Sequence, residues 1–542
     1  MGYIDQITLF GYLIGILILG VVVGYRKRTS SDQFFLAGRN LRWPFIGAGL
    51  FCANISTIHL IGLASDGYRV GLVVGNFEWG AAFCLIMLGI VFSRIYFRNE
   101  LGTLPEFMEK RYSSAARSIL AFIFVLSALL IHIGISLYAG ARVLEEFFQF
   151  PFVASIVAIS AVTAIYTIVG GLRAVVVTDA VQAVLLLLGA FILTLFGIRA
   201  LSEHGIDSYA QFTEALRPHQ MDMLQPVMDE NAGGYFSLRE YSWYSVIFGY
   251  PILGIWYWCT DQTIVQKVLG AKTERDSANG AIFAGFLKIL PVFVMVFPGV
   301  LGYVLFSNAI GADNDATLPI MMKRLLPTGL KGLMAAALVA ALGSTIGAAL
   351  NSTATLTARD IVKRMRPQTR DSTLVLIGRI AAGVVILLAM LWSTQGGKFK
   401  SIFVAINKIP MMFAPAITCV FLGGVFWPRG TRQGAMAALL FNLSVGAIYM
   451  IIDIPLVGST QLISGGLGIP FMQVGWYLFL LSTGVYIVVS LSTPKPAPSK
   501  VEGVCWANPL DTVRGKLSGA GDPRVLAGLL MVTMVVLYLI FG

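Results

Sequence analysis

Four polar side chains interrupt an apolar stretch that runs from about residue 43 to 63. The stretch is about long enough for a helix to cross a bilayer, yet its centre carries Asn54, Ser56, Thr57 and His59. An unpaired polar group in hydrocarbon costs several kcal/mol. These side chains therefore either pair with other helices or line a wet cavity where the helix is broken. An Asn and a His beside a Ser-Thr pair favour the cavity.

Charged and aromatic side chains in other apolar stretches could contribute to the same site. Glu78 lies within GNFEWGAAF and Lys288 within AGFLKILPVF, and an ionisable group inside a membrane segment is by default a functional candidate. The stretch 250–266, YPILGIWYWCTDQTIVQ, offers Tyr257 and Trp258 among Pro, Gly, Thr, Asp and Gln. We take these residues as candidate ligands, although Lys288 could instead extend its ammonium group to the membrane surface.

A further stretch, VAINKIP, contains Asn407 and Lys408. Lys408 can face the outer water and is left out of the site. The remaining amide, imidazole, carboxylate, ammonium and aromatic groups suit a small polyhydroxylated solute, because polar groups bond to its hydroxyls while a ring face covers its apolar side. A carboxylate substrate would favour Arg or a bare helix N-terminus.

Two adjacent hydroxyl groups point to a bound cation. Ser344 and Thr345 lie beneath a run of small residues in LVAALGSTIGAALNSTATL. Hydroxyl and carbonyl oxygens are hard ligands that suit a small cation. Since helix packing explains most Ser-Thr pairs, a cation site here requires that the pair faces the free carbonyls of the broken helix between residues 43 and 63.

The composition is that of a polytopic membrane protein. Hydrophobic residues make up 57% of the 542-residue chain and charged residues only 12%, against about 25% in soluble proteins. The net charge of +11 is spread over loops and does not indicate a nucleic-acid partner. Five cysteines show neither metal nor disulfide spacing. Residues 1–28 lack a basic n-region and a cleavage site, so we read them as a first transmembrane helix.

Apolar segments predict an all-α protein with about fourteen transmembrane helices. The segments centre near residues 14, 54, 84, 130, 160, 188, 252, 293, 343, 383, 413, 442, 483 and 532. Basic residues gather in alternate loops, such as 26–28, 94–98 and the run from Lys267 to Arg275, which are expected in the cytoplasm. We therefore predict a multi-pass protein of the plasma or inner membrane with both termini on the non-cytoplasmic side.

The two irregular helices, the second and the seventh, are separated by five crossings. Each would open a group of five helices, and an odd number of crossings turns the second group upside down relative to the first. Broken helices at corresponding places in two halves are the best indication in a sequence of a midplane binding site in a transporter. The repeat is inferred from this spacing alone.

These residues resemble the sodium/solute symporter family, and within it the sodium/glucose cotransporters, from residue 32 to about 450. YTIVGGLRAVVVTDAVQ (166–182) and GGVFWPRGTRQGA (423–435) look like the two family signatures. LGTLPEFMEKRY (101–112) is similar to the family's cytoplasmic loop. WYWCTDQTIVQKVLGAK (256–272) is close to the animal sugar cotransporters, as are the Asn, His and Glu of the first two stretches.

The resemblance implies an all-α transporter core of five plus five helices in an inverted repeat, with discontinuous helices. Residues 1–31 would form an extra N-terminal helix with a basic loop. The core would cover 32–428, with repeats at about 43–200 and about 238–428. Residues 429–542 would add three C-terminal helices.

The resemblance also implies a set of site residues. Sugar contacts would come from Asn54, His59, Glu78, Tyr257, Trp258, Lys288 and Asn407. A sodium ion would be held by carbonyls of Cys52, Ile55 and Ala341 and by hydroxyls of Ser344 and Thr345. The outer gate would be formed by Leu63, Phe77 and Phe403, and the inner gate by Tyr257. Asp179 matches an acidic residue near the sodium exit or a second sodium site.

Three positions depart from the family pattern. Asn407 stands where sugar cotransporters usually have Gln, and Gly254 where relatives carry Asn or Thr. Both changes remove reach or a hydrogen bond. Ala348 lacks a hydroxyl that could help to build a second sodium site, which favours one sodium ion per cycle.

We therefore expect a sodium-coupled symporter of a hexose of the glucose or galactose type, which works in the bilayer by alternating access and makes no covalent bond. A symporter of myo-inositol, sialic acid or an amino acid is the alternative. Broken helices and a midplane gate argue against a channel. The sequence shows no nucleophile–base pair or metal set of an enzyme. The oligomeric state is left open.

Overall fold

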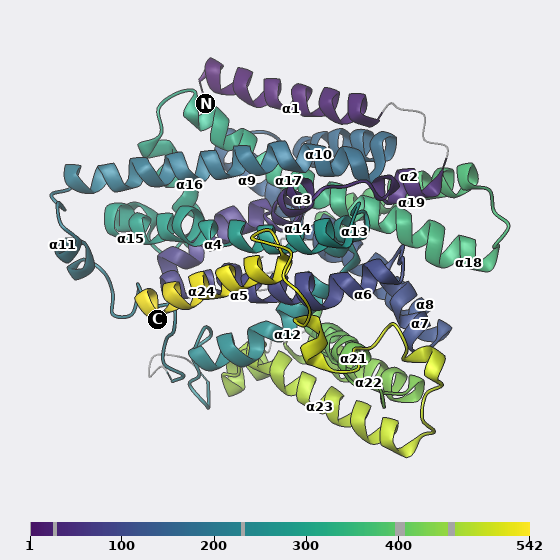
Figure 1. Ribbon diagram of the computed structural model, residues 1–542. Helices are drawn as coiled ribbons and strands as arrows, with labels where there is room; N and C mark the ends of the chain where they lie inside the picture. The colour runs from purple at the N-terminus through teal and green to yellow at the C-terminus, as the bar shows by residue number, and fades with distance from the viewer. Residues whose placement is uncertain (1, 25–29, 229–233, 396–406, 454–460) are drawn as a thin grey trace.

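The structure is a computed structural model that describes residues 2–24, 30–228, 234–395, 407–453 and 461–542. Helices make up most of these residues and run broadly in one direction, while short helices and loops gather at the two ends of the bundle (Figure 1). The prediction of an all-α membrane protein is confirmed.

Most of the long helices are assembled from shorter pieces. Up to residue 203 the main helices are α1 (Tyr3–Gly24), α3 (Trp43–Asn54), α4 (Thr57–Val70), α5 (Asn76–Met87), α6 (Ser93–Arg98), α8 (Ser114–Ser127), α9 (Ser136–Phe148) and α10 (Phe152–Glu203). Beyond it they are α12 (Tyr250–Ile255), α13 (Gln262–Leu269), α14 (Glu274–Leu287), α15 (Phe297–Ile310), α17 (Leu330–Leu356), α19 (Asp371–Ser393), α21 (Ala414–Phe426), α22 (Arg432–Asp453), α23 (Phe471–Ser492) and α24 (Pro523–Phe541).

Short segments connect or extend these helices. The connecting helices are α2 (Ser31–Phe35), α7 (Leu104–Arg111), α11 (Tyr209–Glu214), α16 (Thr317–Leu325) and α18 (Lys363–Met365). Wider, π-helical turns join several pieces within the core, at η3 (Leu88–Phe92), η4 (Ala128–Ile135), η5 (Ser245–Gly249), η6 (Trp256–Thr260), η7 (Val292–Val296) and η9 (Thr357–Val362). Such turns are frequent at functional sites.

The helix count differs from the prediction because three predicted crossings are not separate long helices. Of the described helices, ten are long and apolar enough to cross a membrane, or eleven when the bent pair α3 and α4 counts as one crossing. The 52-residue α10 covers two predicted segments, and Gly171, with φ 56°, bends the chain between them. The seventh segment is divided into short helices, and α21 has only 13 residues.

The second crossing is broken where its polar residues stand. α3 ends at Asn54, Ile55 and Ser56 are extended (ψ 100° and 172°), and α4 begins at Thr57. The side chains of Ser56 and His59 cap the first turn of α4, which satisfies amide groups that a break leaves without helical partners. The two helices meet at an angle of 60°.

The seventh crossing, residues 245–269, is broken in the same manner. Its π-helical segment η6 ends at Thr260, and Asp261 is extended with φ −73° and ψ 126°. The Asp261 carboxylate caps the following α13 by accepting from the amide of Thr263 at 2.8 Å. The structure thus has both of the breaks that the sequence predicts.

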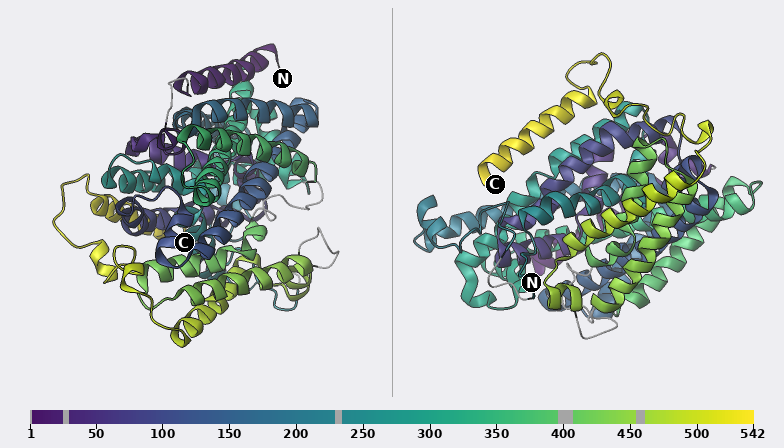
Figure 2. Two further views of the ribbon diagram at one scale, coloured as in Figure 1. Left: turned by 90° about the vertical axis from the view of Figure 1, so that its right-hand side faces the viewer. Right: turned by 90° about the horizontal axis from the view of Figure 1, so that it is seen from below.

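The broken helices lie in the middle of the molecule. Figure 1 shows α1 along one edge and α22 and α23 along the opposite edge, with α3, α4, α13, α14 and α17 between them, and the left-hand view of Figure 2 shows the same order from another side. Both termini lie at the same end of the bundle in these views.

The last helix, α24, packs against α5 and α14. The Tyr538 hydroxyl donates to the Asn76 side chain at 2.7 Å, and its ring meets Trp79 edge to face at 5.3 Å between centroids. Asn76 and Trp79 flank Glu78 on α5. The C-terminal helix therefore supports the element that carries one of the predicted ligands.

Candidate functional site

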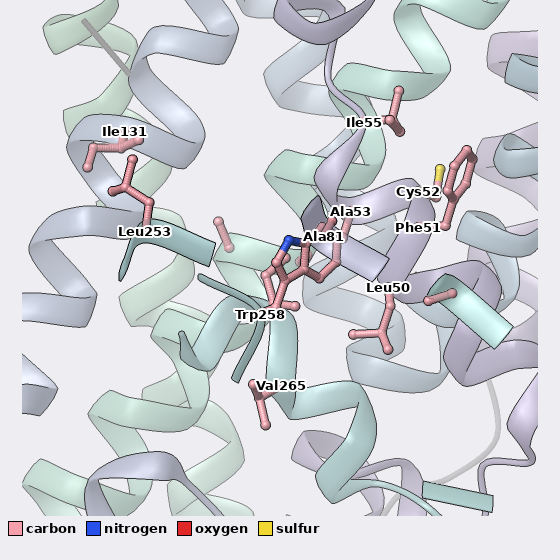
Figure 3. Packing of buried hydrophobic residues seen from close by; sticks show 14 of the residues in the cluster. Leu50, Phe51, Cys52, Ala53, Ile55, Ala81, Ile131, Leu253, Trp258 and Val265 are labelled. Atoms are coloured by element: carbon pink, nitrogen blue, oxygen red, sulfur yellow. The ribbon is translucent and has the colours of Figure 1, made fainter. Parts of the chain in front are cut away.

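A cavity of about 100 Å³ lies between the breaks of the second and seventh crossings. The predicted residues that line it are Asn54, His59, Phe77, Glu78, Tyr257, Trp258, Thr345 and Asn407. Figure 3 shows Trp258 directed toward the last turn of α3, with Leu253 and Ile131 together on another wall. The structure thus brings most of the predicted ligands to a single cavity.

Lys288 joins two of the predicted ligands at one wall of the cavity. Its side chain is fully buried at the end of α14, and Nζ donates to Glu78 Oε2 at 2.5 Å and to Asn54 Oδ1. Nζ also lies 5.3 Å from the centre of the Trp258 ring. A buried ammonium needs such partners, since its isolated charge is strongly disfavoured in the interior. Lys288 therefore does not reach the membrane surface but links α3, α5 and α14.

His59 is held by the break itself. Its Nδ1 accepts a hydrogen bond from the backbone amide of Ser56 at 3.3 Å and lies 3.0 Å from the Ser56 hydroxyl. A nitrogen that accepts from a backbone amide carries no proton, so the neutral ring carries its proton on Nε2. His59 can thus offer a donor to a ligand, with the ring orientation fixed by the cap.

Aromatic rings form another part of the lining. Tyr257 is half-buried, and the centroid of its ring lies 5.2 Å from that of the Trp258 ring. Its hydroxyl interacts with the Asn54 side chain. Phe77 also lines the cavity, and its carbonyl accepts from the Tyr250 hydroxyl at 2.9 Å. The flat faces therefore lie directly beside the polar groups that Lys288 organises.

The predicted outer gate is only partly within the described residues. Phe77 lines the cavity, whereas Leu63 is fully buried in the hydrophobic core and is not part of the lining that the described residues form. Phe403 lies outside the described residues. Tyr257 lines the cavity at the break of the seventh crossing, which is the place expected of an inner gate.

Oxygen atoms of α17 meet the end of α3 beside the cavity. The Thr345 hydroxyl donates to the carbonyls of Ala53 at 3.1 Å and Ala341 at 3.2 Å. Two predicted sodium ligands, Thr345 and Ala341, are therefore adjacent to the free carbonyl end of the broken helix. The Ala53 carbonyl, rather than those of Cys52 and Ile55, makes the bond to Thr345.

Ser344 points to the neighbouring Asp179 of α10. Its hydroxyl donates to Asp179 Oδ1 at 2.6 Å, and the Cys52 side chain interacts with the same serine. Because the proton of Ser344 is used by the carboxylate, lone pairs of its oxygen remain for a cation. The residues present fit a small hard cation between the end of α3 and α17.

Lys267 was expected in a cytoplasmic loop, and this prediction is wrong. The residue is fully buried in α13, and its Nζ lies 3.6 Å from Asp179 Oδ2, beyond hydrogen-bond length. Neither atom has a hydrogen-bond partner among the described residues. In the sequence Lys267 stands only five residues before Lys272, which concealed that the last turn of the helix is still inside the protein.

Lys408 is also buried rather than exposed to outer water. Its Nζ pairs with Asp453 of α22 at 3.1 Å and with the Ser464 hydroxyl at 2.9 Å. Asp453 in turn accepts from two backbone amides, at residues 463 and 464. This contact joins the end of the predicted core to the C-terminal helices, and Lys408 is not among the described residues that line the cavity.

The cavity includes polar residues that sequence reasoning missed. Most prominent are His132 of η4 and Ser136 of α9, both buried. The rule that identified Glu78, an ionisable group inside an apolar run, also applies to the segment LSALLIHIGIS, residues 126–136. Tyr250 and Trp256 complete the aromatic part of the lining.

The comparison with protein families identifies the chain. The sequence model of the sodium:solute symporter family matches residues 34–442, about three quarters of the chain. This protein belongs to the sodium:solute symporter family. The family prediction is confirmed, and the protein is a membrane transporter rather than an enzyme.

Similar members of the family include transporters of several cyclic solutes. The chain is 34% identical to a sodium/myo-inositol cotransporter 2 of Mus musculus, over 83% of this chain and 70% of the relative. It is 35% identical to a sodium/mannose cotransporter of Bos taurus, over 89% and 85%. A sodium/glucose cotransporter 4 of Danio rerio is 32% identical, over 90% and 78%.

Solved structures with the same fold support the inverted-repeat architecture of this symporter. A Na⁺-coupled sialic acid symporter in a substrate-bound outward-open state superimposes with a TM-score of 0.76 and 19% identity, covering 91% of this chain and 99% of that structure. Mhp1, a nucleobase-cation-symport-1 family transporter in a closed conformation, gives a TM-score of 0.53 and 15% identity, covering 86% and 96%. Both likenesses concern the fold.

Proposed function

We propose that this symporter imports a hexose sugar of the glucose or galactose type together with sodium, by alternating access. The observation that carries the proposal is the Lys288–Glu78–Asn54 cluster beside the Tyr257 and Trp258 rings in one cavity. A neutral polyol needs several donors and acceptors and a flat apolar surface, and this wall offers both.

Sugar binding would use hydroxyl groups in place of bonds that the cluster now makes within itself. Glu78 would accept charge-assisted bonds from sugar hydroxyls, and Lys288 and the Nε2 of His59 would donate to others. Asn407, which lines the same cavity, would add an amide. Tyr257 would lie against the apolar face of the pyranose and separate it from the cytoplasmic exit.

Sodium would be bound at the end of α3 by carbonyls of Cys52, Ile55 and Ala341 and by the hydroxyls of Ser344 and Thr345. The bonds of Thr345 to the carbonyls of Ala53 and Ala341 support this placement, since they show oxygen atoms converging there. Asp179 would stabilise the ion through Ser344 or take part in its exit. Since Asn54 is the last residue of α3, an ion that fixes the break would also fix a sugar ligand, and this supplies the coupling.

The direction and driving force follow from the membrane potential. With the termini on the non-cytoplasmic side, inward movement of one sodium charge through 100 mV supplies about 2.3 kcal/mol, or about a fiftyfold concentration ratio of the sugar. We propose one sodium ion per cycle, because Ala348 brings no hydroxyl to the region of Ser344.

A second candidate substrate is myo-inositol. It is a cyclic polyol of similar size, so the same polar wall and aromatic face suit it equally well. The 34% identity to a mouse sodium/myo-inositol cotransporter supports it, and relatives named for mannose and glucose support a hexose. Sialic acid and amino acids carry a carboxylate, which the Glu78 side of the cavity would repel.

Uptake by purified protein in proteoliposomes tests the proposal. Radiolabelled glucose, galactose, mannose, myo-inositol, sialic acid and proline are supplied with an inward sodium gradient or with choline in its place. We expect sodium-dependent accumulation of a hexose or of myo-inositol, abolished by a sodium ionophore. Accumulation of only a carboxylate solute, or equal uptake in choline, would overturn the proposal.

A further inference from the structure

Two polar groups on another wall of the cavity make no hydrogen bond among the described residues. They are His132 Nε2 and Ser136 Oγ, on residues 4% and 0% exposed. Both residues line the same cavity as Glu78 and Tyr257. A buried polar atom without a hydrogen bond costs about 1–3 kcal/mol, so an arrangement that retains two of them side by side needs an explanation.

The two residues share one face of their helix because of their spacing along the backbone. They stand four positions apart, His132 in the π-helical η4 and Ser136 at the start of α9. Such spacing places side chains one above the other. Their wall belongs to the fourth crossing, whereas the Lys288–Glu78–Asn54 cluster comes from α14, α5 and α3.

Tyr257 connects the two walls. Its hydroxyl interacts with Asn54, and the centroid of its ring lies 5.9 Å from the centroid of the His132 ring. A ring-shaped solute that covers Tyr257 would therefore meet the Lys288–Glu78–Asn54 cluster along one edge and His132 with Ser136 along another.

We propose that His132 and Ser136 form a second hydroxyl-binding subsite. This subsite binds hydroxyl groups on the edge of the sugar or cyclitol that is remote from Glu78. This inference rests on the proposed function. His132 donates from Nε2 to a substrate hydroxyl, and the Ser136 hydroxyl donates to or accepts from the same or an adjacent one. The two orphaned groups are then satisfied only when substrate is bound.

Asp261 positions the imidazole. Its Oδ2 lies 3.5 Å from His132 Nε2, while its Oδ1 caps α13 at the break of the seventh crossing. The two atoms make no hydrogen bond, so the carboxylate favours the tautomer with the proton on Nε2 while that N–H remains available to a substrate hydroxyl. It also makes the subsite unfavourable for an anionic group, so the subsite selects neutral hydroxyls.

The test measures uptake of the best-transported hexose or cyclitol and of its monodeoxy analogues, one for each ring position, by wild-type protein and by the His132→Phe and Ser136→Ala variants. We expect the KM for the parent solute to rise about three- to tenfold in each variant, as the loss of one hydrogen bond predicts. The sodium concentration for half-maximal uptake should change less than twofold.

The analogues give the decisive comparison. In wild-type protein, at least one deoxy analogue should bind about three- to tenfold more weakly than the parent, and in His132→Phe this penalty should disappear, since the donor for that hydroxyl is gone. If every analogue keeps the same penalty in both variants, or the parent KM is unchanged, His132 and Ser136 do not bind substrate and the inference is wrong.

Matched controls separate binding from packing. Ser127→Ala removes another buried, unpartnered hydroxyl from the same crossing that does not line the cavity, and His204→Phe changes an exposed histidine at the end of α10. Both should leave KM unchanged. If His132→Phe fails to fold, by gel filtration and thermal unfolding, His132→Gln keeps a donor and Ser136→Ala carries the analogue test.

The same assay distinguishes the two proposals. Wild-type protein that accumulates no hexose or cyclitol with sodium overturns the proposed function, whatever the variants do. Wild-type protein that accumulates one with sodium, but shows no coupling between analogues and His132, leaves the proposed function intact and overturns the second subsite.

Discussion

Two of the buried lysine–carboxylate pairs, Lys288–Glu78 and Lys267–Asp179, differ in how their groups are satisfied. Lys288 donates to Glu78 at 2.5 Å and to Asn54, so its ammonium is held by hydrogen bonds. Lys267 lies 3.6 Å from Asp179, and the facing atoms make no hydrogen bond among the described residues. Both lysines are fully buried.

The difference indicates two kinds of task. The first pair is complete without a ligand, so the proposed sugar would have to exchange hydrogen bonds with it, and binding there would reward a precise match. The second pair keeps a charge balance but leaves Asp179 able to respond to what happens at Ser344, to which it is bonded at 2.6 Å. We therefore expect substitutions in the first pair to impair sugar recognition and substitutions in the second pair to impair sodium coupling.

The largest effect is expected from Lys288→Met. Removal of one partner of a buried, bonded pair leaves Glu78 uncompensated and destabilises by about 3–5 kcal/mol. Uptake should be lost and the thermal unfolding temperature should fall strongly. The double variant Lys288→Met with Glu78→Leu should recover stability without recovering uptake. Lys267→Met should destabilise less, because no hydrogen bond is broken, and equal losses would remove the distinction between the pairs.

The next largest effect is expected from substitutions of Tyr257. Tyr257→Ala should abolish concentrative uptake although the protein folds, because the platform for the sugar and the inner gate are lost together. Tyr257→Phe keeps the ring and should weaken uptake only by the value of one hydrogen bond, about 0.5–1.5 kcal/mol. Initial rates and steady-state accumulation in proteoliposomes measure both. Wild-type accumulation by well-folded Tyr257→Ala protein would rule out the gate assignment.

Isosteric amides at the two carboxylates test the comparison directly. Glu78→Gln should raise the KM for sugar by about tenfold, because a neutral acceptor replaces a charge-assisted one, with little change in sodium dependence. Asp179→Asn should raise the half-saturating sodium concentration with a smaller change in sugar KM. If Glu78→Gln alters only sodium dependence, the glutamate belongs to the cation path and the roles of the pairs are exchanged.

The smallest effect is expected from Ser344→Ala. One side-chain oxygen leaves the proposed sodium site, and Asp179 loses a hydrogen bond, so the half-saturating sodium concentration should rise several-fold at unchanged sugar KM. Ser352→Ala, a buried hydroxyl two turns away on the same helix, is the control and should behave as wild type. Unchanged sodium dependence of Ser344→Ala would exclude this residue from the site.

The sequence was sufficient to predict the breaks and most of the polar wall. Asn54 and His59 in the middle of an apolar run favoured an interruption over pairing with other helices, and the structure has it at Ile55 and Ser56. The same reasoning on ionisable groups inside apolar segments gave Glu78 and Lys288, and the resemblance to sugar cotransporters added the gate role of Tyr257; these residues line the cavity or hold its wall. These residues were predictable because a polar group in hydrocarbon is costly and therefore conspicuous.

Other features depend on contacts between distant segments, which no local pattern contains. The burial of Lys267 is set by its position beside Asp179 of α10, and near Lys272 and Arg275 the residue looked like a loop charge. The carbonyl that meets Thr345 belongs to Ala53, one residue from a predicted ligand, because the break fixes which carbonyls turn outward. His132 and Ser136 were missed although the rule applied to Glu78 covers their segment as well, and only the structure shows that they face the same cavity.

The position of Lys288 over Trp258 gives the transporter an intrinsic optical probe. An indole excited state is sensitive to a nearby charge, and here an ammonium lies 5.3 Å from the ring centre. A sugar that draws Lys288 toward its hydroxyls changes this field without any change in the fold. The chain has nine tryptophans, so the signal is isolated as the difference between wild-type and Trp258→Phe emission spectra. Occupancy of the cavity could then be followed in real time without a label.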